Sequence, residues 1–331
     1  MMKYRRNVKK SINCCAEIKE IFMFGNLFPI IKKITLPVFL LIFAVGVQNS
    51  VGQRYLEEVF SKVDSVPDVI YGQAINYQGE NQSLFFDFYS PYGDTSRRRP
   101  LLIYAHGGGF GGGSRKYPSI GTMCEKLARR GYAVANISYR LDPHFDYSKS
   151  DTNRRAITDA MHDMRAAVRF FKANQAKYGI DTSNIFIGGE SAGAVTAMTV
   201  GYVNKKSDLK AYPKTSPYNL EGNSGTPGYS SKVKSVLCLC GTIPDTTAMD
   251  SPDDPPLLWV HGSSDPIVSF SLAEEILERA ENIGISYQKR VFEGATHCPW
   301  IKTLPNSELY LDSLVNYMSQ YMHPLITEGK L

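Results

Sequence analysis

The segment Gly189-Glu190-Ser191-Ala192-Gly193 holds the residue of this 331-residue chain best suited to do chemistry. Branched and aromatic residues at 185–187 precede it and small apolar residues follow it, so the sequence predicts a strand, a tight turn and a helix. In such a turn a serine hydroxyl projects from the end of the sheet. The residues two positions to either side are glycine because the strand and helix pass too closely for a Cβ. We therefore predict that Ser191 is a nucleophile.

Two further residues of the right type, Asp265 and His297, follow predicted strands later in the chain. These strands are predicted at residues 257–262 and 286–292. Since the carboxyl ends of parallel strands meet at one edge of a sheet, we expect Ser191, Asp265 and His297 to come together there. A carboxylate that orients an imidazole, which then takes the proton of a serine, supports nucleophilic attack on a carbonyl carbon.

Six glycines occupy seven positions after the predicted strand 101–105, in the segment His106-Gly107-Gly108-Gly109-Phe110-Gly111-Gly112-Gly113. Bare backbone N–H groups there can approach a ligand closely, either as a phosphate cradle or as an oxyanion hole. The spacing does not fit the phosphate-binding motifs, and a serine at 191 favours the oxyanion hole. We assign the oxyanion hole to the N–H groups of Gly108, Gly109 and Ala192, and we expect a substrate pocket lined by Phe110, Glu190 and Trp300.

Together these motifs resemble the carboxylesterase and lipase branch of the α/β-hydrolase superfamily, in which the triad follows the order Ser, Asp, His. Segments 138–141 (Ser-Tyr-Arg-Leu) and 261–265 (His-Gly-Ser-Ser-Asp) extend the likeness, which covers about residues 67–322. The resemblance implies a mostly parallel sheet of about eight strands with helices on both faces. It also implies ester hydrolysis through an acyl-enzyme on Ser191, without a cofactor. The glutamate directly before the serine, Glu190, resembles the motif of the type-B carboxylesterases. The chain is, however, much shorter than those enzymes.

The alternation of apolar strands and helical patterns predicts one α/β domain over residues 53–331. Helices are expected at 53–66, 120–130, 151–178, 270–283 and 308–321. Strands are expected at 69–76, 84–89, 101–105, 132–141, 185–188, 233–240, 257–262 and 286–292. The link 241–256 is too short for a large cap domain. The polar stretch 204–232 predicts a surface insertion, which leaves open a role as a lid.

Residues 1–52 have the character of a leader. Lys32 and Lys33 precede the 14-residue apolar run 34–47, and Ser50 and Gly52 fit the small residues before a cleavage site. A secretory signal peptide is therefore expected, with Met23 as a possible true start and a secreted or periplasmic mature protein. The run is short for a membrane span, so we expect no stable membrane anchor after cleavage. An uncleaved anchor is the alternative.

Charge argues against a nucleic-acid partner. The leader holds eight of the 37 Lys and Arg residues and two of the 32 acidic residues, so the remainder carries 29 basic and 30 acidic side chains. A near-neutral body does not attract a polyanion. The expected partner is a small-molecule or polymer-linked ester.

The cysteines outside the leader are too few and too scattered for a disulfide framework. A bridge between Cys240 and Cys298 is conceivable in an oxidising compartment. No His and Cys spacing fits a metal site, so no metal is expected.

Two other functions are compatible with parts of the pattern. A serine exopeptidase of the prolyl-oligopeptidase type shares the triad order, but the chain has no segment for a gating domain. A non-catalytic binding protein on the same fold is the second alternative, and the presence of all three triad residues speaks against it.

Overall fold

The structure is a computed structural model that describes residues 53–146, 150–205, 208, 219–301 and 305–329. The predicted leader, with its apolar run at 34–47, lies outside these residues. Residues Arg54–Leu331 group as one compact unit. Among the described helices, none combines the length and the apolar character that crossing a membrane requires.

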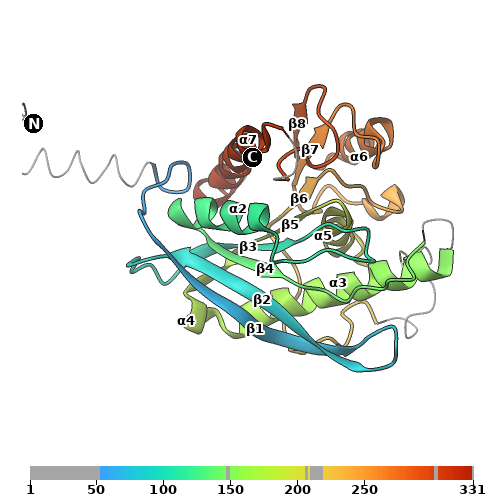
Figure 1. Cartoon of the computed structure of the whole chain (residues 1–331), viewed down its shortest axis with the longest axis horizontal. Helices are drawn as coiled ribbons and strands as arrows, with labels where there is room; N and C mark the ends of the chain where they lie inside the picture. The colour runs from blue at the N-terminus through green and yellow to red at the C-terminus, as the bar shows by residue number, and fades with distance from the viewer. Residues whose placement is uncertain (1–52, 147–149, 206–207, 209–218, 302–304, 330–331) are drawn as a thin grey trace, which may run out of the picture. The chain divides into compact units, whose positions relative to one another are not determined.

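A sheet of eight strands runs through the described unit in the order β1-β2-β4-β3-β5-β6-β7-β8 (Figure 1). The antiparallel hairpin of β1 and β2 pairs antiparallel with β4, and the remaining neighbours are parallel. This confirms the predicted α/β-hydrolase type of sheet. The strands are β1 (Val63–Ile75), β2 (Asn81–Pro91), β3 (Arg99–Ala105), β4 (Ala133–Ile137), β5 (Ile180–Glu190), β6 (Ser235–Leu239), β7 (Leu257–Gly262) and β8 (Tyr287–Phe292).

Helices cover both faces of the sheet, as predicted. One buried cluster joins α2 (Pro118–Arg129) and α7 (Ser307–Thr327) to alternate strand residues such as Leu102 and Tyr104. The other cluster joins α3 (Ser150–Ala173), α5 (Ala192–Tyr202) and α6 (Phe270–Ile283) to the intervening residues such as Ile103. This division follows from the two-residue period of a strand, which sends successive side chains to opposite faces.

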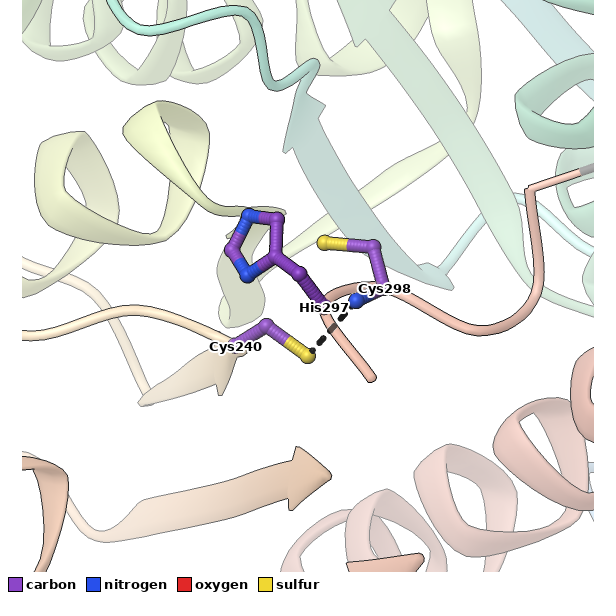
Figure 2. A group of neighbouring side chains, drawn as sticks. All are labelled: Cys240, His297 and Cys298. Atoms are coloured by element: carbon purple, nitrogen blue, oxygen red, sulfur yellow. Dashed lines mark hydrogen bonds between the residues drawn. The ribbon is translucent and has the colours of Figure 1, made fainter. Parts of the chain in front are cut away.

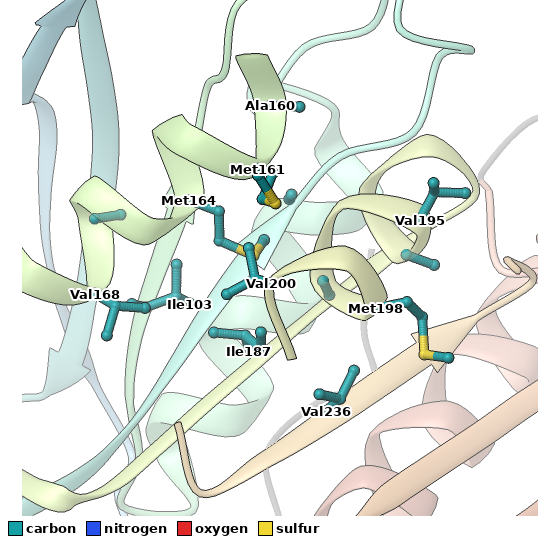
Figure 3. Close-up of a cluster of buried hydrophobic side chains, with 14 of the residues drawn as sticks. Ile103, Ala160, Met161, Met164, Val168, Ile187, Val195, Met198, Val200 and Val236 are labelled. Atoms are coloured by element: carbon teal, nitrogen blue, oxygen red, sulfur yellow. The ribbon is translucent and has the colours of Figure 1, made fainter. Parts of the chain in front are cut away.

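The helix that begins at the predicted nucleophile turn is buried along its whole length. Figure 3 shows Met198 and Val200 of α5 in the same apolar cluster as Met164 and Val168 of α3, above Ile187 of β5. Close packing of this kind resists small displacements. It therefore fixes the position of the turn between β5 and α5.

The helix expected at 53–66 is wrong. After Gln53 the chain forms a turn, and the N–H groups of Tyr55, Val59 and Phe60 donate to the carbonyls of Arg129 and Arg130 at the end of α2. These backbone groups satisfy the exposed carbonyls of another helix end, so they cannot form a helix of their own. The strand β1 then begins at Val63.

Several other boundaries differ from the expectation, and two elements are shorter than predicted. The single helix predicted at 151–178 is interrupted at Asn174, whose φ of −108° separates α3 from the short α4 (Gln175–Tyr178). The strand predicted at 132–141 ends at Ile137. Just beyond it, the Tyr139 hydroxyl donates to the His106 carbonyl at the start of the glycine loop.

The links around the site are short or irregular. Between β6 and β7 the chain forms one turn of 3₁₀ helix, η3 (Thr246–Ala248), so no large cap stands there. Part of the predicted insertion 204–232 lies outside the described residues. Its segment 219–232 has neither helix nor strand, and its carbonyls at Leu220 and Glu221 accept hydrogen bonds from Arg165 and Arg169 of α3.

Candidate active site

The turn between β5 and α5 is as tight as the sequence predicts. Ser191 has φ 53°, a left-handed conformation that a serine adopts only when its surroundings enforce it. A Cβ at Gly189 or Gly193 would collide with the carbonyl oxygen of Ala105 on β3. The two glycines therefore allow the strand and helix to close around Ser191, whose side chain makes no capping bond to α5.

Asp265 and His297 lie beyond β7 and β8 and contact each other. Nδ1 of His297 is 2.6 Å from Oδ2 of Asp265, and this carboxylate is fully buried whereas the imidazole is partly exposed. The other oxygen, Oδ1, accepts from the backbone N–H groups of Ile267 and Val268 at 2.8 and 3.0 Å. With the carboxylate ionised, Nδ1 carries the proton that it donates to Asp265. Nε2 is then left as a proton acceptor.

The structure brings Ser191 to the same edge of the sheet. Its backbone N–H donates to Leu239 at the end of β6, and the following residue, Cys240, lies beside the His297 ring. Within the described residues, no hydrogen bond joins the Ser191 hydroxyl to His297. Such bonds commonly form or tighten only when substrate binds. Of the predicted triad, Asp265 and His297 are therefore in contact. Ser191 lies at the same edge of the sheet.

The glycine loop after β3 adjoins the serine. Gly108 and Gly109 have φ 123° and 60°, and a Cβ on Gly107 would lie 3.2 Å from the Ser191 Cβ. The loop is closed by a bond from the Gly112 N–H to the Gly108 carbonyl. Ala192 begins α5, where backbone N–H groups have no partner within the helix. These predicted oxyanion donors therefore lie next to Ser191.

Glu190 is buried beneath the serine turn. Its carboxylate is buried and accepts from Trp300 Nε1 at 2.6 Å, from the Tyr104 hydroxyl at 3.3 Å and from the Gly107 backbone N–H. Burial raises the pKa of Glu190 above its usual range, and these donated bonds oppose the rise. The side chain thus connects the serine turn with the glycine loop and the loop after His297.

Phe110 and Trp300, the other two residues predicted at the pocket, are also nearly fully buried. Trp300 donates its indole N–H to Glu190. The Phe110 ring packs against Tyr139 and Phe145 beneath the glycine loop. Both rings thus support the loops around Ser191 from inside the protein. The sequence offered one signal for Trp300, an indole N–H that needs a buried acceptor.

Replacing Glu190 by alanine removes the acceptor for three buried donors, so we expect the free energy of unfolding to fall by roughly 3 kcal/mol. Turnover should fall as well, because the loops that carry His297 and the oxyanion donors lose their common anchor. Glu190→Gln keeps one acceptor oxygen and should lose less in both measurements. Denaturant unfolding and steady-state kinetics check this, and an alanine variant as stable and active as the wild type would contradict it.

His106 supports the glycine loop, and His261 supports the triad acid. The His106 ring stacks on Tyr139 and its Nδ1 donates to the Gly107 carbonyl at 2.7 Å. His261, which the sequence analysis did not single out, bonds through Nε2 to the Val268 carbonyl and lies 3.2 Å from Asp265 Oδ2. Its place four residues before Asp265 at a strand end was the available signal.

Burial also predicts how stability depends on pH. It lowers the pKa of His106 and of His162 from the usual 6.5 to about 4. The folded state thus keeps both rings neutral, so their stabilising effect is complete above pH 6.5 and is lost as the pH falls towards 4. Each accounts for roughly 3 kcal/mol over that window.

Denaturant unfolding at pH 7 and pH 4 measures this effect. In His162→Gln the amide can still donate to the Asn219 carbonyl that His162 contacts, while the titrating group is gone. Its loss of stability on acidification should be smaller than that of the wild type. Equal losses in both proteins would show that His162 does not contribute.

The described cysteines, Cys124, Cys238, Cys240 and Cys298, are buried and free in the structure. The conceivable bridge between Cys240 and Cys298 is not formed, although the Cys298 N–H lies 3.3 Å from the Cys240 sulfur. The two residues are nevertheless neighbours, as the suggestion of a bridge requires, because the ends of β6 and β8 are aligned.

The mostly parallel sheet, the strained serine turn and the Asp–His pair beyond β7 and β8 define an α/β-hydrolase fold. In agreement, esterase 2 of Thermogutta terrifontis superposes with a TM-score of 0.62 over 82% of this chain and 95% of that one, at 19% identity. Residues 86–251, half of the chain, match the BD-FAE family model. The chain therefore belongs to the BD-FAE family.

Curated relatives are similar to part of the chain. Gut esterase 1 of Caenorhabditis elegans is 29% identical over 144 residues, which cover 43% of this chain and 25% of that protein. Carboxylesterase 1D of Mus musculus is 29% identical over 149 residues, 44% of this chain and 24% of that protein. The match thus spans about a quarter of the length of these relatives.

Proposed function

We propose that this protein is a serine esterase that cleaves carboxylic esters by two-step acyl transfer. The observation that carries the proposal is the 2.6 Å contact between His297 and a buried Asp265 at the sheet edge where the strained Ser191 stands. A neutral imidazole with a fixed tautomer, beside a serine at a strand end, is equipped for nucleophilic catalysis. The names of the curated relatives, among them gut esterase and carboxylesterase, support the same chemistry.

In the proposed reaction, Nε2 of His297 takes the Ser191 proton as the serine oxygen attacks the ester carbonyl. Asp265 stabilises the imidazolium that results. The N–H groups of Gly108, Gly109 and Ala192 hold the negative oxygen of the tetrahedral intermediate. His297 then returns the proton to the leaving alcohol, and water, activated by the same ring, releases the acid from Ser191.

The substrate class follows from what surrounds this site. No large cap stands between β6 and β7, which suits an ester carried on a bulky alcohol. Acetyl or feruloyl groups on plant polysaccharide, and small soluble esters, are the substrates we propose.

A series of p-nitrophenyl esters from acetate to palmitate, with methyl ferulate and an aminoacyl-proline p-nitroanilide, tests the proposal. We expect turnover of the esters and none of the anilide, and the chain-length optimum reports the size of the acyl site. Cleavage of the anilide without cleavage of any ester would favour the exopeptidase alternative. Binding without turnover of either class would favour the non-catalytic alternative.

We also propose that the chain is exported. The apolar run 34–47, the lysines before it and the small residues Ser50 and Gly52 support cleavage before Gln53. Mass spectrometry of the protein released by expressing cells should find Gln53 at the N-terminus. A product that retains residues 34–47 and sediments with membranes would indicate the uncleaved anchor instead.

A further inference from the structure

Two cysteines converge on the catalytic histidine. Cys240 follows β6, Cys298 follows His297 in the loop after β8, and one sulfur or nitrogen atom of each of the three side chains lies within 4.8 Å of the others. Figure 2 shows the Cys298 sulfur beside the imidazole, with the Cys240 side chain beneath the backbone nitrogen of Cys298. Both thiols are buried, and the ring is partly exposed.

The backbone holds this group in place. Cys240 and Cys298 have φ 50° and 46°, left-handed conformations that cysteine rarely adopts. The Cys240 N–H donates to Val260 of β7, and the Cys298 N–H donates to the Cys240 sulfur. The pair is therefore fixed by the sheet on one side and by the His297 loop on the other.

Two thiolates and one imidazole are ligands that Zn²⁺ and Cd²⁺ prefer, and three protein ligands leave a fourth position for water. We propose that Cys240, Cys298 and His297 form a binding site for one soft divalent ion of this type. On binding, each thiol loses its proton to solvent and its sulfur forms a bond to the ion, while an unprotonated ring nitrogen donates its lone pair.

Occupancy of this site is incompatible with the base role of His297, and this second part rests on the proposed esterase function. A metal on Nε2 occupies the lone pair that would take the Ser191 proton. A metal on Nδ1 replaces the proton that His297 donates to Asp265. With the metal on either ring nitrogen, His297 can no longer accept the Ser191 proton. The ion therefore acts as a reversible inhibitor.

Cadmium titration of the full chain tests the binding. Cys14 and Cys15 of the leader are first changed to serine so that they cannot bind the ion, and the protein is reduced and treated with a chelator. We expect one equivalent of Cd²⁺ to produce the ultraviolet absorption of a cadmium–thiolate bond. Cys240→Ser and Cys298→Ser should each weaken binding more than about 10-fold, since loss of a ligand exceeds the loss of an outer-shell partner.

Cys124→Ser is the matched control, because Cys124 is a buried thiol of α2 outside the group. It should bind Cd²⁺ as the parent does. The site is refuted if the folded parent shows no thiolate absorption at one equivalent, or if both serine variants bind as tightly as the parent.

The activity measurement separates the two claims. Zn²⁺ should abolish ester turnover by the parent, and EDTA should restore it. In the presence of Zn²⁺, Cys298→Ser should retain a larger fraction of its metal-free activity than the parent retains. Cadmium binding by a protein without esterase activity would leave the site intact and remove the proposed function. An active esterase that binds no cadmium would refute the metal site and leave the proposed function intact.

Discussion

Ser191→Ala will lower kcat/KM for ester substrates by at least about 10⁴-fold, because the acyl-enzyme cannot form without the serine oxygen. The fold should be unaffected, since the Ser191 side chain makes no capping bond to α5 and the new residue is slightly smaller. Thermal unfolding and steady-state kinetics on p-nitrophenyl acetate measure both effects.

Ser183→Ala is a suitable control for this experiment, because Ser183 stands near the start of β5, where its hydroxyl bonds only locally to Asp181. It should keep full activity. If Ser191→Ala retained more than about 1% of wild-type turnover in a folded protein, the assignment of the nucleophile would be wrong.

Asp265→Asn is expected to lower kcat about 10⁴-fold with little change in fold. The backbone N–H groups of Ile267 and Val268 hold one carboxylate oxygen, so the asparagine should place its oxygen there and turn its NH₂ group towards His297. An amide that donates to Nδ1 forces the ring proton onto Nε2, the atom that must accept the serine proton. The base is then in the wrong tautomer.

Asp245→Asn is the matched control, because Asp245 caps η3 at an exposed position. It should behave as the wild type. Two other acids of the link between β6 and β7 have partners elsewhere: Asp250 pairs with Lys205, and Asp254 accepts from Asn204 and two backbone N–H groups. Full activity in Asp265→Asn would require the acid role to be reassigned.

The serine turn and the succession of strands along the chain were predictable because their signals are local. Glycines at 189 and 193 encode the close approach of β5 and α5, and the apolar runs encode buried parallel strands. The helix predicted at 53–66 was wrong although the composition of the segment favours a helix. Its N–H groups donate instead to the carbonyls of Arg129 and Arg130. Partners distant in the sequence decided the outcome there.

The supporting contacts of the site were not predictable for the same reason. Glu190 and Trp300 are 110 positions apart, and their bond depends on the alignment of β5 with the loop after β8. The proximity of Cys240 and Cys298 is different, because the sequence already suggested that pair. A sequence pattern can identify a residue that does chemistry, but the residue that holds it in place is visible only once the strands are paired.

The most direct test of the central claim is covalent labelling of the chain with an organophosphate that reacts only with activated serine hydroxyls. We predict one adduct per chain, located by peptide mass spectrometry on Ser191, absent in Ser191→Ala and formed far more slowly in Asp265→Asn. A folded protein that resists the reagent, or carries the adduct on another residue, would contradict the proposal that His297 and Asp265 activate Ser191.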